Sequence, residues 1–141
     1  MNTIKTILYW FISWTWGFIM TFLGAIVALI LIARGHKPKR FHYNIYFEFG
    51  EDWGGINLGA FFFVNKGATN CTKAHEAGHG LQNLMFGPLF PFVIGIPSLI
   101  RCQWREFIVK HRGVTRLPDY DAIWFERNAT NYGYKYFIVE K

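Results

Sequence analysis

Two histidines and a glutamate near the middle of the chain have the spacing of a zinc hydrolase motif. His75, Glu76 and His79 fit the pattern H-E-x-x-H. On a helix, imidazoles at positions i and i+4 lie on one face about one turn apart, so both can bind one zinc ion. Glu76, beside the first histidine, can then take a proton from a water on the metal and later donate it. The motif therefore predicts metal-assisted hydrolysis.

A third metal ligand is expected elsewhere, because a catalytic zinc site holds three protein ligands and leaves one position open. Glu126 is the best candidate. It follows the apolar residues 123–125 on a predicted helix, where a carboxylate needs a partner. The alternative is that His75 and His79 are ordinary helix residues that hydrogen-bond to their neighbours or lie exposed as a pair.

The order of these residues resembles that of the gluzincin zinc metalloproteases, in which H-E-x-x-H is followed on a later helix by E-x-x-A-D. Here the second half reads Glu126-Arg127-Asn128-Ala129-Thr130. Glu126 and Ala129 match, and Thr130 stands where the family has aspartate. The resemblance covers residues 41–133. It is strongest to the membrane-anchored HtpX-like and CAAX-processing proteases and to small bacterial membrane proteins with the same order of motifs.

The resemblance implies a zincin-like fold with Zn²⁺ as cofactor and Glu76 as the catalytic base. The family aspartate orients a zinc-binding histidine, and Thr130 or Asn131 is the candidate to replace it here. A hydrolase also needs a group that stabilises the oxyanion of the transition state. His111, Tyr132 and Tyr134 are candidates, and the sequence does not choose among them.

The composition predicts a membrane protein. The chain has 141 residues, of which 52% are hydrophobic and 17% are charged, whereas soluble domains carry about 25% charged residues. Residues Ile7–Ala33 contain no charged residue and no histidine, and the run exceeds the ~20 residues that span a bilayer. It ends in the basic stretch Arg34–Arg40 rather than in a cleavage site. We therefore predict a retained transmembrane helix; the alternative is a buried core helix.

The distribution of basic residues predicts the orientation of this helix. Lys5 precedes the apolar run, and the Arg34–Arg40 stretch follows it. The positive-inside rule then places the C-terminal side in the cytoplasm. The expected localisation is the bacterial cytoplasmic (inner) membrane, with a single crossing and a cytoplasmic metal-binding domain. The net charge of +6 is assigned to the membrane and not to nucleic acid, because the basic residues flank apolar runs.

The rest of the chain predicts an α+β fold, with a transmembrane anchor at residues 1–40 and a zincin-like domain at residues 41–141. Residues 41–49 and 56–64 favour a β-hairpin across a glycine-rich turn. Gly59, inside the second strand, indicates a bulge or a close backbone approach. Two interpretations of this second strand stay open. It is an edge strand beside the motif helix to which an extended substrate adds, or it packs inside an ordinary sheet.

A second apolar segment, residues 84–100, separates the two histidines from Glu126. Because all three ligands must meet one ion, the two ends of this segment must lie on the same side. It is short for a membrane span and contains three prolines, so we predict a re-entrant or interfacial segment. The other predicted elements are a motif helix from Thr72 to Gly87-Pro88, a helix and loop at Arg101–Arg116, a helix at Tyr120–Tyr132 capped by Asp119 or Asp121, and a strand at Tyr134–Val139.

These features favour a membrane-tethered zinc-dependent metallopeptidase acting on a peptide or membrane-protein substrate near the bilayer. The alternative is a metal-binding membrane scaffold without catalysis, motivated by Thr130 at the family's aspartate position. A third possibility is a structural membrane module whose histidines are satisfied in its core. The two cysteines, Cys71 and Cys102, are interpreted as free thiols rather than as ligands or a disulfide.

Overall fold

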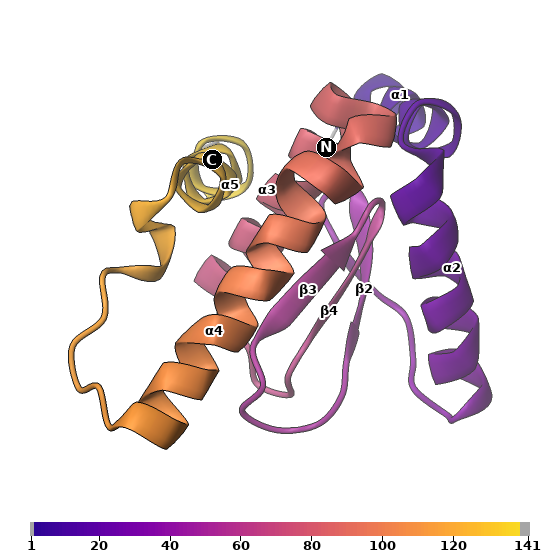
Figure 1. Ribbon diagram of the computed structural model, residues 1–141. Helices are drawn as coiled ribbons and strands as arrows, with labels where there is room; N and C mark the ends of the chain where they lie inside the picture. Colours follow the sequence, from indigo (N-terminus) through magenta and orange to yellow (C-terminus); the bar gives the residue numbers. More distant parts are fainter. Residues whose placement is uncertain (1, 139–141) are drawn as a thin grey trace.

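A four-stranded sheet lies between helices in the computed structural model, which describes residues 2–138 (Figure 1). The helices are α1 (Thr3–Thr15), α2 (Phe18–Ala33), α3 (Asn70–Phe86), α4 (Ile96–Arg112) and α5 (Trp124–Gly133). The strands are β1 (Lys39–Phe41), β2 (Asn44–Glu48), β3 (Gly55–Leu58) and β4 (Phe61–Val64). Short 3-10 or π-helical turns are η1 (Gly87–Leu89), η2 (Pro91–Gly95), η3 (Tyr120–Ala122) and η4 (Tyr134–Ile138).

The strand order is β1-β2-β4-β3, with β2 and β4 parallel and the outer pairs antiparallel. The predicted hairpin between residues 41–49 and 56–64 is therefore wrong. Gly59 has φ +70°, which favours glycine, and it forms a tight turn that splits the second predicted strand into β3 and β4. Because Phe62, Phe63 and Val64 are fully buried, β4 occupies the centre of the sheet and β3 its edge.

Helices cover both faces of the sheet, as Figure 1 shows for α2 on one side and α3 on the other. One core joins Ala28 and Leu31 of α2 to Phe47 and Phe63. A second cluster joins Tyr46, Phe62 and Val64 of the sheet to Ala74 and Ala77 of α3. The segment expected to serve only as a membrane anchor thus packs against one face of the sheet.

The apolar run Ile7–Ala33 is not one helix, so the prediction of one continuous transmembrane helix is wrong. The chain breaks at Trp16-Gly17, and α1 and α2 are bent by 98° to each other. Within residues 2–138 no single helix is both long and apolar enough to cross a membrane, although this bent pair passes the test of length and composition when taken together. Asn83 of α3 stabilises the break, because its Nδ2 donates to the Gly17 carbonyl at 3.3 Å.

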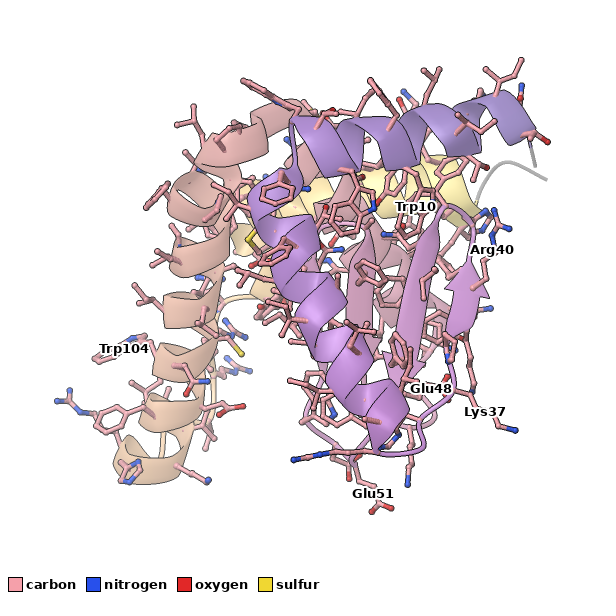
Figure 2. All side chains as sticks on the ribbon, turned by 90° about the vertical axis from the view of Figure 1, so that its right-hand side faces the viewer. Trp10, Lys37, Arg40, Glu48, Glu51 and Trp104 are labelled. Atoms are coloured by element: carbon pink, nitrogen blue, oxygen red, sulfur yellow. The ribbon has the colours of Figure 1, made fainter. Side chains whose placement is uncertain are left out.

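Two tryptophans of the broken helix pair, Trp10 and Trp16, have contacts within the fold. Figure 2 shows Trp10 beneath α1, on the side of the sheet. Its indole nitrogen donates to the Tyr43 carbonyl at 2.9 Å. Trp16 packs against Gly87, where an added Cβ would come within 2.3 Å of the indole ring. These two side chains therefore join the broken helix pair to the rest of the molecule.

The second apolar segment turns back on itself. The helical stretch Asn70–Leu89 and the stretch Pro91–Arg112 are bent by 118° to each other, so residues 84–100 do not form one straight helix. Gly87 adopts φ +52°, and the prolines that follow cannot continue a regular helix. The motif helix was predicted to end at Gly87-Pro88, and α3 does end there.

Several predicted boundaries need correction. The motif helix starts at Asn70, and its cap is Thr69, whose Oγ1 accepts from the Thr72 amide at 3.2 Å. The last long helix starts only at Trp124 and has no side-chain cap, so neither aspartate serves that role. The tail expected as a strand is a π-helical turn through Ile138, and its last predicted residue, Val139, lies outside the described residues.

Candidate metal centre

The structure brings the three predicted metal ligands together. Nε2 of His75 and Nε2 of His79, both on α3, each lie 3.1 Å from Oε2 of Glu126 on α5. One ligand atom from each residue lies within 4.8 Å of the others. His79 and Glu126 are buried, and His75 is partly exposed. The helical spacing of the motif thus places both imidazoles on one face, as predicted.

Close contact between α3 and α5 positions Glu126 opposite the motif. A Cβ added to Gly78 would lie 2.0 Å from the Ala129 carbonyl oxygen, and one added to Gly133 would lie 2.1 Å from the Ala74 carbonyl oxygen. Only residues without side chains let the two backbones approach this closely. Ala74 and Ala129 are fully buried at the same contact.

Each histidine is held at its second ring nitrogen. Nδ1 of His75 lies 2.9 Å from Oγ1 of Thr130, so Thr130, one of the two predicted candidates, is placed to orient a candidate metal ligand. Nδ1 of His79 lies 2.7 Å from Oε1 of Gln82, a residue that sequence reasoning missed. Asn131, the other candidate for this role, is exposed. Such contacts fix the orientation and tautomer of a ligating imidazole.

The tautomer of His79 follows from the amide of Gln82. Nε2 of Gln82 donates to the Phe125 carbonyl at 2.8 Å, so its oxygen must be the atom that faces His79. That oxygen only accepts, and Nδ1 of His79 therefore carries a proton. In the neutral ring, Nε2 then presents a lone pair to a carboxylate oxygen of Glu126, which is also an acceptor. Two acceptors at 3.1 Å need either a metal ion between them or a second proton on the imidazole, which then donates to Glu126.

Glu126 is ionised in this environment. Burial raises the pKa of its carboxyl, but hydrogen bonds with His75 and His79 outweigh burial and bring the pKa well below its usual range. Ser98 of α4 also donates to Glu126, through the other carboxylate oxygen, Oε1. An ionised carboxylate is the form that binds a metal.

The donor set and its spacing fit zinc. Two imidazoles and one glutamate form a known catalytic zinc set, with bonds of about 2.0–2.2 Å. In a tetrahedral site with such bonds, ligand atoms lie about 3.3 Å apart, close to the two nitrogen–oxygen distances of 3.1 Å. Three protein ligands leave the fourth position open. The residues present therefore fit a zinc ion with one site for water or substrate.

A cavity of about 650 Å³ adjoins the ligands. His79 and Glu76 line it, together with residues of β3, α2, η2 and α4 and with Tyr120. Glu76 is buried, and Gly55 of β3 lies so near that an added Cβ would be 2.7 Å from its carboxylate oxygen. Burial raises the pKa of Glu76 to about 7, with an opposing effect of His75 and a further increase from Glu126. A carboxyl with that pKa suits a general base near neutral pH.

The three predicted oxyanion candidates lie away from this cavity. His111 is exposed near the end of α4 and stacks on Phe107, and neither Tyr132 nor Tyr134 lines the cavity. Tyr120 lines it instead, and its ring centroid is 6.1 Å from that of His75. The sequence offered one signal for Tyr120, its place just before the helix that carries Glu126.

Comparison with known proteins adds no assignment. No protein-family model matches the chain, and no curated protein and no solved structure is detectably similar to it.

Proposed function

We propose that this chain is a membrane-associated, zinc-dependent metallopeptidase. The observation that carries the proposal is the acceptor-to-acceptor contact of His79 and Glu126, with His75 at the same oxygen, beside a cavity that also holds a buried carboxylate, Glu76. A metal ion bound by all three side chains satisfies this contact, and the neighbouring carboxylate is the group that a hydrolase needs.

His75, His79 and Glu126 would hold the zinc ion, and Thr130 and Gln82 would orient its two histidines. When bound, zinc supplies Lewis acidity at the open position of the site. Glu76 accepts a proton from the water that attacks the peptide carbonyl and transfers it to the nitrogen that leaves. Tyr120 lies beside His75, where its hydroxyl is available to the oxyanion.

The position of β3 supports an extended peptide as substrate. β3 is an edge strand, and Gly55, Ile56, Asn57 and Leu58 all line the cavity. Asn57 fastens this strand to the motif helix, because its Nδ2 donates to the Glu76 carbonyl at 2.9 Å. A free strand edge pairs with an extended chain through main-chain hydrogen bonds. Most other lining residues are apolar, which favours apolar substrate side chains.

The proposal includes association with a lipid bilayer. Large apolar side chains are exposed along α1, α2, η2 and α4, and a large exposed apolar surface is typical of a site that contacts a membrane or another protein. Basic residues follow α2 and occupy the end of α4, as the positive-inside rule expects for cytoplasmic ends. The side chains concerned include Ile4, Ile7, Phe11, Trp14, Phe18, Phe22, Leu29, Phe92, Leu99, Ile100, Trp104 and Phe107.

Metal analysis and a peptidase assay on the detergent-purified protein test the proposal. We expect one zinc per chain, lost in a His75→Ala, His79→Ala double variant because two of three ligands are removed. Glu76→Gln should retain zinc and abolish hydrolysis of apolar peptides. Stoichiometric zinc in the double variant would contradict the site. Zinc binding without hydrolysis by the wild type would instead favour the non-catalytic metal-binding scaffold.

A further inference from the structure

We propose that Ser98 is a positioning residue that fixes which oxygen of Glu126 faces the histidines. Ser98 lies in the first turn of α4, and its hydroxyl donates to Oε1 of Glu126. The other oxygen, Oε2, faces both imidazoles at 3.1 Å. Ser98 therefore contacts one carboxylate oxygen of Glu126, and the two histidines contact the other. The inference rests on the zinc site of the proposed function.

Hydrogen-bonding capacity sets the direction of this contact. A carboxylate that ligates a metal only accepts, so the hydrogen of the Ser98 hydroxyl must point to Glu126. The contact leaves Oε1 of Glu126 occupied and unable to turn toward the metal.

The serine matters because Glu126 is completely buried. Water cannot replace a partner that Oε1 loses, and an unpaired buried oxygen is costly. Without Ser98 the carboxylate gains by rotating or shifting, which disturbs the single-oxygen contact with the histidines. A residue that fixes a ligand in this way is worth about 10–100-fold in metal affinity.

Ser98 also links the metal site to the wall of the cavity. It belongs to α4, which among the described residues buries none of its own side chains fully and contributes Leu99, Cys102 and Gln103 to the cavity lining. The contact with Glu126 is thus one way in which α4 is seated on the site. Displacement of this helix by a bound chain would change the geometry of a metal ligand.

Zinc affinity, measured by chelator competition on the purified full chain, tests the inference. We expect Ser98→Ala to bind zinc about 10–100-fold more weakly than the wild type, and Ser98→Thr to restore affinity because it keeps the hydroxyl. Ile100→Ala is the matched control, since it removes an exposed side chain of α4 outside the cavity lining, and its affinity should equal that of the wild type.

Spectroscopy and a second variant complete the test. The visible spectrum of Co²⁺ bound in place of zinc should change in Ser98→Ala and not in Ile100→Ala, because only the former alters how Glu126 binds. Wild-type affinity and spectrum in Ser98→Ala would overturn the inference. If Ser98→Ala does not fold, Ser98→Val compared with Ser98→Thr decides, because valine keeps the shape of threonine and lacks its hydroxyl: weaker zinc binding in Ser98→Val supports the inference, and equal binding refutes it. Absence of zinc binding by the wild type would refute the proposed function itself.

Discussion

At the scale of single residues, the two histidines of the proposed zinc site are oriented by neutral partners. Thr130 contacts His75 and Gln82 contacts His79. A neutral hydroxyl or amide makes an imidazole less basic than a carboxylate does, because a charge-assisted hydrogen bond is stronger. The expected consequence is a site whose zinc affinity can still be raised by substitution.

Thr130→Asp tests this expectation. The carboxylate would accept from Nδ1 of His75 and should raise zinc affinity by about tenfold, whereas Thr130→Val, which removes the contact, should lower it by a similar factor. Chelator competition measures both. Asn131→Ala is the control at an exposed neighbour and should leave affinity unchanged. Equal affinities in all four proteins would mean that Thr130 does not orient His75.

Glu48 gives a prediction about pH. Its carboxylate binds Lys39 at 2.7 Å and Lys73 at 3.2 Å. The hydrogen bond from Lys39 lowers the pKa of Glu48, burial opposes this effect, and Lys73 reinforces it. A lowered folded-state pKa contributes stability above the unfolded-state value of about 4.3, and that stability is lost as pH falls through the folded-state value.

Glu48→Gln should therefore lower the thermal midpoint at pH 7, because the variant keeps the shape of the side chain and loses the charge. The difference from the wild type should shrink as the pH falls below about 4. Thermal unfolding at several pH values measures it. A difference that stays constant down to pH 3 would show that packing, and not charge, accounts for the loss.

At the scale of elements, the contact between α3 and α5 assembles the metal site. The motif supplies two ligands from one helix, and the third arrives only because glycines let the second helix lie against the first. Stability and metal binding should therefore depend on the same contact.

Gly78→Ala should disturb both properties. Its Cβ would collide with the Ala129 carbonyl at 2.0 Å, and overpacking of this kind costs about 1–3 kcal/mol or more. Zinc affinity should also fall, because the collision pushes α5, and Glu126 with it, away from the two histidines. Gly95→Ala is the control, because its nearest contact would be an ordinary 3.7 Å and the change should stay within about 0.5 kcal/mol. Denaturant unfolding and zinc titration compare the two.

At the scale of the whole molecule, two bent pairs of helices meet at one end of the fold (Figure 1). Asn83 and Trp16 connect the two bends. The basic ends of α2 and α4 both lie at the opposite end in Figure 1, and Figure 2 shows Trp104 of α4 directed away from the sheet. A bilayer would then contact the apolar helices while both basic ends stay on one side.

Cysteine accessibility tests this arrangement. In a Cys71→Ser, Cys102→Ser background, single cysteines at Lys39 and Lys110 should both react with an impermeant maleimide from the cytoplasmic side alone. The reason is that Lys39 follows α2 and Lys110 lies near the end of α4. These two helix ends lie at the same end of the molecule (Figure 1). Labelling from opposite sides would contradict the proposed membrane arrangement, and labelling from both sides in intact cells would contradict membrane embedding of these helices.

The sequence by itself determined the ligands that the structure brings together. The spacing of His75 and His79 is a local property of a helix, and it holds wherever the helix lies. Glu126 could be identified because a carboxylate among apolar residues needs a partner. The end of α3 at Gly87-Pro88 and the close approach at Gly59 also follow from backbone rules that act within a few residues.

Only the tertiary structure decided the break of the apolar run, the order of the strands and the residues that orient the ligands. Asn83 reaches Gly17 and Gln82 reaches Phe125 across long stretches of chain, and no local pattern encodes such pairs. β4 enters the sheet between β2 and β3 because its buried phenylalanines need neighbours on both sides. Local sequence patterns do not reveal Ser98 and Tyr120 either. Ser98 contacts Glu126, and Tyr120 approaches His75, only after α4 and α5 have packed.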